Sequence, residues 1–228
     1  MDYRYFYILW SLLFFLLWGC FFWWRPDLRH SVLRISLLFG FGGVISQLLY
    51  LSDWWQPLTI THTSIGPEDF LIGFSIAGVA AVVYKTLRRR ILERRETILM
   101  RPYTRMFLLG FAAVFVGTFL LTRSSFWASL VPYVFSIAGI WYLRRDLIAE
   151  SIMSGLLLLI IGISIYALLF IPYPDFIHRF WYLPHVWFAQ LFFGIPIAEY
   201  IWFFMTGAFV GPLYPFLRDY RSVPVRFE

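Results

Sequence analysis

The sequence predicts an all-α integral membrane protein, with seven transmembrane helices arranged as two parallel three-helix repeats joined by a spacer helix. Three observations predict it: the composition, seven apolar stretches of roughly span length, and a set of polar landmarks that occurs twice. Of the 228 residues, 61% are hydrophobic, 22% aromatic and only 14% charged. A soluble domain of this length could not bury that much apolar surface.

The apolar stretches predict where the helices lie. They cover residues 5–24, 33–51, 70–84, 106–121, 126–143, 152–170 and 194–216. About 20 residues are needed to cross a hydrocarbon core of about 30 Å. The stretch at 70–84 is short, so we expect its helix to begin in the turn at residues 66–69 or to extend into the next loop. Pro196 suits the first turn of the last helix.

Basic residues predict the orientation in the membrane. Sixteen of the 19 Lys and Arg residues fall on one side of the predicted spans, eight of them between Lys85 and Arg105. Basic residues favour the cytoplasmic side, so we expect the N-terminus outside the cell membrane and the C-terminus in the cytoplasm. The basic loop 85–105 either binds anionic lipid or a partner, or simply anchors the topology. The net charge of +6 then needs no nucleic-acid partner.

Two sets of landmarks recur in the same order. An offset of 130 residues aligns Asp69 with Glu199, and an offset of 119 aligns Arg25-Pro-Asp27 with Arg144-Arg-Asp146. These offsets divide the chain into a first repeat at 1–105, a spacer helix at 106–124 and a second repeat at 125–228. One spacer helix returns the chain to the same side, so both repeats should have the same orientation. We expect the two aspartates beside the arginines to be salt-bridged anchors.

Three carboxylates stand at predicted helix starts: Glu68, Asp69 and Glu199. A carboxylate in an apolar span is costly when it is charged and unpaired, which favours a functional role. The alternative is an acid that the helix dipole stabilises at the headgroups. Glu68 and Asp69 are neighbours, so they could share a proton or pass it on.

Aromatic side chains accompany both acidic motifs and are candidates for binding a substrate. Their π faces attract cationic carbon as they attract ammonium, and a water-free pocket protects a carbocation from capture. The alternative for most of them is ordinary helix packing. The candidates are Phe70, Phe74, Tyr84, Tyr200, Trp202, Phe203, Phe204 and Tyr214.

The stretch Pro196-Ile-Ala-Glu199-Tyr-Ile-Trp-Phe-Phe resembles the lycopene cyclase domain family, in its heterodimeric bacterial and fungal fusion type, with both repeats fused in one chain. That family carries a Pro-x-Glu-(Glu/Asp) motif followed by aromatic residues in each three-helix unit. Asp53, followed by two tryptophans, resembles the family's acid near a tryptophan. Ala198 stands where the family has Glu, so we expect the second motif to be the weaker one.

The resemblance implies a carotenoid cyclase that acts on a linear polyene such as lycopene in the bilayer, without redox change, metal or nicotinamide. An acid protonates a terminal double bond, the cation closes a ring, and a base removes a proton. Glu68 and Asp69 are the expected acid–base pair, Glu199 the matching acid, and Asp53 a group that orients or receives the proton. Two alternatives remain: another isoprenoid cyclase or hydratase, and a small transporter with an acidic proton relay. The sequence leaves open whether copies form a homo-oligomer.

Overall fold

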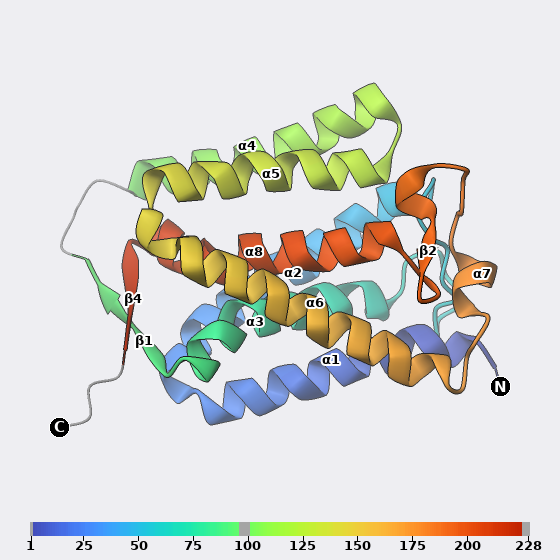
Figure 1. Cartoon of the computed structure of the whole chain (residues 1–228), viewed down its shortest axis with the longest axis horizontal. Coiled ribbons are helices and arrows are strands. Elements are labelled where there is room, and N and C mark those ends of the chain that lie inside the picture. Colours follow the sequence, from blue (N-terminus) through green and yellow to red (C-terminus); the bar gives the residue numbers. More distant parts are fainter. Residues whose placement is uncertain (1, 96–100, 225–228) are drawn as a thin grey trace.

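The computed structural model describes residues 2–95 and 101–224, apart from the side chains of residues 101–105. Seven long helices in this part form one bundle: α1 (Arg4–Trp24), α2 (Arg29–Tyr50), α3 (Pro67–Leu87), α4 (Arg101–Thr122), α5 (Ser125–Leu143), α6 (Ile148–Phe170) and α8 (Ile197–Arg218). Strands β1 (Arg90–Arg94) and β4 (Tyr220–Pro224) pair at one end of the bundle, whereas the short helix α7 (Phe176–Phe180) and the hairpin of β2 (Leu191–Phe192) with β3 (Ile195–Pro196) lie at the other (Figure 1).

Six of these helices are long and apolar enough to cross a membrane, so the chain has the character of a membrane protein. The apolar part of α4, Met106–Thr122, is shorter than the usual span. The outer helices expose large apolar side chains, among them Leu16, Phe41, Ile45 and Phe135. Such faces are typical of helices in contact with lipid, which needs no polar partner.

Helices α3 and α8 form the inner pair of the bundle. Their apolar windows are 72% and 67% buried, against 28–44% for the other four candidate spans. Both run from the hairpin end of the bundle to the β1–β4 end (Figure 1). The acidic motifs therefore stand at the same end, at the starts of the two most enclosed helices.

Close contact between α2 and α3 depends on two glycines. A Cβ atom at Gly43 would lie 2.5 Å from the carbonyl oxygen of Asp69, and one at Gly73 would meet the carbonyl oxygen of Phe39 even more closely. Only a residue without a side chain allows two helix backbones to approach in this way. The glycines therefore bring the middle of α2 next to the start of α3.

The C-terminal half of α8 contains two prolines, and each frees a carbonyl one turn earlier because proline has no N–H. Pro212 leaves the carbonyl of Ala208 free, and the Ser151 hydroxyl of α6 donates to it at 2.6 Å. Pro215 leaves the carbonyl of Gly211 free, and Lys85 Nζ of α3 donates to it at 3.0 Å. Two neighbouring helices thus complete the hydrogen bonding of α8.

Lys85 lies inside α3 and not in the basic loop to which the sequence pattern assigned it. Its side chain is 3% exposed and forms an ion pair with Glu150 of α6, which is 2% exposed. The sequence pattern assigned Lys85 wrongly because a long side chain at a helix end can also turn into the bundle. It does so here because a carboxylate and a free carbonyl are available to bind it. The neighbouring loop is also more ordered in secondary structure than predicted, since Arg90–Arg94 forms strand β1.

The two arginine landmarks make matching bonds. Arg25 binds Asp27 and the carbonyl of Arg90 in β1, and Arg144 binds Asp146 and the carbonyl of Tyr220 in β4. The expected salt bridges at both aspartates are therefore confirmed. The offset of 130 residues also aligns Arg90, the first residue of β1, with Tyr220, the first residue of β4. When each strand is put in the place of the other at this offset, the antiparallel residue pairs of β1 with β4 stay the same.

Most helix boundaries agree with the apolar pattern, with a few shifts. The predicted extension of the third span is confirmed, because α3 runs from Pro67 to Leu87. Helix α8 begins at Ile197, so Pro196 precedes the helix and lies in β3 instead of the first turn. Helix α4 begins at Arg101, inside the segment assigned to the first repeat. Residues 96–100 and the side chains of residues 101–105, at the end of the basic loop, lie outside the described part of the structure.

Candidate functional site

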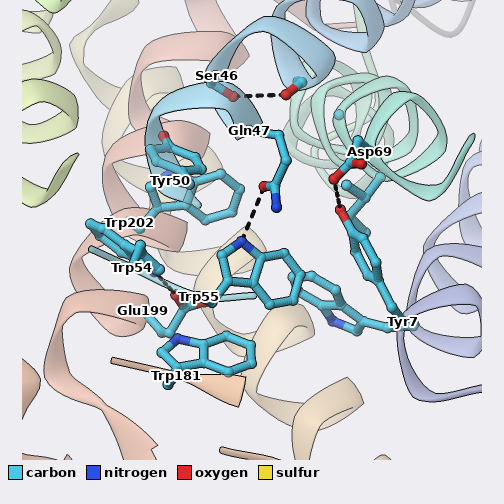
Figure 2. Close-up of a pocket in the computed structure, with 14 residues that line it drawn as sticks. Tyr7, Ser46, Gln47, Tyr50, Trp54, Trp55, Asp69, Trp181, Glu199 and Trp202 are labelled. Carbon is cyan, nitrogen blue, oxygen red and sulfur yellow. Dashed lines mark hydrogen bonds between the residues drawn. The ribbon is translucent and has the colours of Figure 1, made fainter. Parts of the chain in front are cut away.

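A cavity of about 70 Å³ lies among the helix ends that carry the acidic motifs. Asp69 of α3 and Glu199 of α8 both line it, although they are 130 residues apart in the sequence (Figure 2). The rest of the wall is mainly aromatic and comes from α1, α2, α3, α8 and two loops. Its other members are Tyr7, Trp10, Gly43, Ser46, Gln47, Tyr50, Trp54, Trp55, Ile72, Gly73, Trp181 and Trp202.

Asp69 is 2% exposed and each of its carboxylate oxygens accepts a hydrogen bond. The Tyr7 hydroxyl of α1 donates to Oδ1 at 2.6 Å, and the backbone N–H of Gly66 donates to Oδ2 at 2.7 Å. The second bond caps the start of α3, because Asp69 is the third residue of the helix and Gly66 precedes it. Oδ2 of Asp69 therefore stabilises the start of α3, whereas Oδ1 is the oxygen at the cavity.

Glu199 is 4% exposed, and its hydrogen-bond donors among the described residues are side chains. Trp54 Nε1 donates to Oε1 at 2.7 Å, and the Tyr166 hydroxyl of α6 donates to Oε2 at 3.1 Å. Trp54 lies in the loop after α2, so a residue of the first half of the chain holds the acid of the second half. Trp181 lies beside this carboxyl group (Figure 2). Two good donors reduce the cost of keeping a carboxyl group in an apolar interior.

Glu68 contacts the loop after α2. Its Oε1 accepts the backbone N–H of Ile60 at 2.6 Å, and this bond ties the loop after α2 to α3. Glu68 is fully buried but does not line the cavity. Among the described residues, no hydrogen bond joins it to Asp69, so the geometry does not support a proton shared by the two neighbours. The structure instead brings Asp69 together with Glu199.

Asp53 lies outside this cavity and has a different task. Its Oδ2 accepts the backbone N–H of Ser125 at 2.8 Å, at the first residue of α5. A carboxylate at this place stabilises the helix start. The tryptophan that follows Asp53 in the sequence reaches the cavity instead, since Trp54 binds Glu199.

Of the eight aromatic residues proposed to bind a substrate, Trp202 lines the cavity. Phe203 packs behind the wall, with ring contacts to Trp10 and Tyr166. The other six lie elsewhere. Phe70 and Phe74 pack against one another, and Phe204 covers Gly155. Tyr84 and Tyr214 lie toward the β1–β4 end, and the Tyr200 hydroxyl donates to the carbonyl of Phe192. For these six the packing alternative is the better description.

The sequence pattern missed most of the cavity wall and the second donor to Glu199. Tyr7 and Tyr166 lie within apolar spans that contain many aromatic residues, so nothing local distinguishes them. Trp181 comes from the longer connection between α6 and α8. Gln47 did leave a signal, because it is the only amide side chain between residues 33 and 51. An amide in an apolar helix needs a partner or a ligand, and this criterion would have selected it.

The described residues contain no group of three or more side chains suited to hold a metal ion. No protein-family model, curated protein or solved structure matches the chain. The site therefore has to be interpreted from its own geometry.

Proposed function

We propose that the chain is a membrane-embedded isoprenoid cyclase, resembling lycopene β-cyclase, that closes the linear end of a polyene by acid-initiated chemistry without redox change. One observation carries the proposal: two enclosed carboxyl groups from distant parts of the chain face one cavity whose walls are indole and phenol rings. An acid, a base and a water-poor aromatic wall are the parts that such a reaction needs.

The two carboxyl groups divide the proton transfers. Glu199, held by neutral indole and phenol donors, is the acid: its O–H protonates the terminal double bond and leaves a tertiary carbocation. A second double bond of the chain attacks that cation and closes the ring. Asp69, whose anion the N–H at the start of α3 stabilises, is the base that removes a proton and restores a double bond. One proton is added and one is lost, so the product is an isomer of the substrate.

The indole rings supply the environment for the cation. Trp10, Trp54, Trp55 and Trp202 line the cavity together with the two acids. A cation over an indole face gains about 0.5–2 kcal/mol, which favours the charged intermediate over its neutral neighbours on the reaction path. This proposal gives the acidic motifs of the two repeats one shared site, in which Glu199 and Asp69 have different roles.

The size of the cavity sets the mode of binding. About 70 Å³ is roughly half of the ~150 Å³ that holds a benzene ring, so the branched end of an isoprenoid chain enters only if the surrounding helices move apart, and a whole polyene does not fit. The remainder of the substrate then extends into the lipid, along helices whose outer faces are apolar, such as Phe41 and Ile45 of α2. The substrate class is therefore a long hydrocarbon that partitions into the bilayer.

The proposal includes the membrane arrangement. We infer seven crossings, with α1–α3 and α5, α6 and α8 as two parallel repeats and α4 as the spacer. The common direction of α3 and α8, the matching arginine bonds and the exchangeable register of β1 with β4 support it. The basic residues support an external N-terminus and a cytoplasmic C-terminus.

Product analysis tests the function. The chain is expressed in a lycopene-producing host, and the carotenoids are separated by chromatography. Wild type should yield cyclic products, whereas Glu199→Gln and Asp69→Asn should lower ring formation by about 10²–10⁴-fold, as expected for loss of general acid–base catalysis. Glu93→Gln is the matched control, because Glu93 is an exposed acid that binds Arg221 far from the cavity. Linear carotenoids alone from wild type protein present in the membrane would contradict the proposal.

A proton-coupled transporter is the second candidate, and the buried pair of Lys85 with Glu150 favours it. A charged pair inside the bundle is typical of proton pathways in membrane proteins. The structure places this pair toward the β1–β4 end, away from the cavity. In the same host, a transporter would leave the carotenoids unchanged. Glu150→Gln would then lower transport activity as much as Glu199→Gln.

A further inference from the structure

Gln47 presents a hydrogen-bond donor to the cavity that the proposed cyclisation does not use. The side chain is 3% exposed, and its Oε1 accepts the indole N–H of Trp55 at 3.2 Å. Its Nε2 has no hydrogen-bond partner among the described residues. Figure 2 shows the amide pointing into the middle of the cavity, between Trp55 and the Asp69–Tyr7 pair.

The orientation of the amide follows from Trp55. An indole nitrogen can only donate, so the group that faces it must be the amide oxygen. Turning the amide over would place two donors against each other and lose the bond. The Nε2 group is therefore directed into the cavity by a neighbour, and its two N–H bonds remain available to a ligand.

A buried donor without a partner is costly, and such groups are rare in folded proteins. The cavity offers the complementary acceptor in Asp69, whose Oδ1 faces it beside Tyr7. A hydroxyl group matches this pair, since its oxygen can accept from the amide while its hydrogen is donated to the carboxylate. A hydrocarbon end would leave the amide unsatisfied.

We propose that Gln47 and Asp69 form a subsite for a hydroxyl oxygen, either the terminal hydroxyl of an isoprenoid ligand or a water molecule beside it. The inference rests on the proposed function for the apolar body of the ligand, and it extends the substrate class to oxygenated isoprenoids. It also gives Gln47 a role in specificity, because the residue separates hydroxylated ends from hydrocarbon ends by one hydrogen bond.

Binding to the purified full chain tests the subsite. The probes are geraniol, a ten-carbon isoprenoid alcohol, and the matching hydrocarbon without the hydroxyl, each titrated calorimetrically into wild type and Gln47→Leu. The ratio of the two affinities, compared between the proteins, cancels the partitioning of the probes into detergent. Wild type should favour the alcohol about tenfold more than Gln47→Leu does, the value of one well-formed hydrogen bond. Gln190→Leu, an exposed glutamine outside the cavity, should behave as wild type.

A high-resolution structure of wild type with geraniol distinguishes a ligand hydroxyl from a water molecule. It also tests the subsite if Gln47→Leu does not fold. Oxygen density that continues into the ligand chain, within hydrogen-bond distance of Gln47 Nε2, supports a ligand hydroxyl. Isolated density there supports a water. Equal preference in both proteins together with a cavity that shows no oxygen density at Gln47 overturns the proposal. Hydroxyl preference without any ring product would contradict the cyclase alone, and ring product with neither hydroxyl preference nor oxygen density at Gln47 would contradict this subsite alone.

Discussion

At the scale of single residues, the chain satisfies buried polar groups with partners from distant segments. Glu199 is held by Trp54, 145 residues away, and Lys85 reaches both Glu150 and a carbonyl that a proline has freed. Such groups are costly when one member is removed and the other stays buried. Single substitutions of such groups should therefore lower the stability of the protein more than paired substitutions do.

The ion pair of Lys85 and Glu150 provides a test. Lys85→Met alone leaves a buried carboxylate without its partner and a free Gly211 carbonyl, and it should destabilise the protein by about 3–5 kcal/mol. The double variant Lys85→Met with Glu150→Leu removes both charges and should recover most of that loss. Thermal unfolding in detergent measures the series, with Arg221→Met at the exposed Glu93 pair as control. A double variant less stable than the single one would show that the charge itself is required.

At the scale of helices, the distance between α2 and α3 decides where Gln47 and Asp69 stand. Gly43 lies one turn before Gln47 and touches the carbonyl of Asp69. The contact is backbone to backbone, so neither partner can move aside by changing a rotamer. The site therefore depends on a residue that has no chemistry of its own.

Gly43→Ala should separate the two helices, because its methyl group would have to lie 2.5 Å from the Asp69 carbonyl oxygen. Overpacking of this kind costs about 1–3 kcal/mol, so the unfolding temperature should fall and ring formation should fall with it. Gly42→Ala is the matched control, since no atom lies within 4 Å of a Cβ there. Equal behaviour of the two variants would mean that the close approach is not needed for the site.

At the scale of the whole molecule, the proposed orientation can be measured directly. A reporter fused after Glu228 should be cytoplasmic, and one inserted between Thr122 and Ser125 should be external, because the basic residues gather at the opposite end. A third reporter, at the N-terminus, tests the number of crossings when it is compared with the one after Glu228, since six crossings would place the two chain ends on one side. A fully reversed pattern would keep the fold and place the cavity at the cytoplasmic face.

Composition and apolar length predicted the helical membrane class because burial requirements are local properties of a segment. The same reasoning found Asp69 and Glu199, since an acid at the start of an apolar helix stands out in the sequence. It misassigned Lys85 and paired Asp69 with Glu68, because the partners of a buried group are chosen by packing between distant helices. Tyr7, Tyr166 and Trp181 were missed because contacts between distant segments bring them to the two acids.

The two prolines of α8 also determine where the bundle can open. Rotation or sliding of the C-terminal half of α8 would break the hydrogen bonds that Ser151 and Lys85 donate to its free carbonyls. Each carbonyl left without a partner would cost about 1–3 kcal/mol of stability. The N-terminal turn of α8 is held through Glu199 by an indole and a phenol, and a ligand in the cavity can replace such contacts. We therefore expect a bulky ligand to enter by movement at the acid-bearing end, with the proline-bearing end as the pivot.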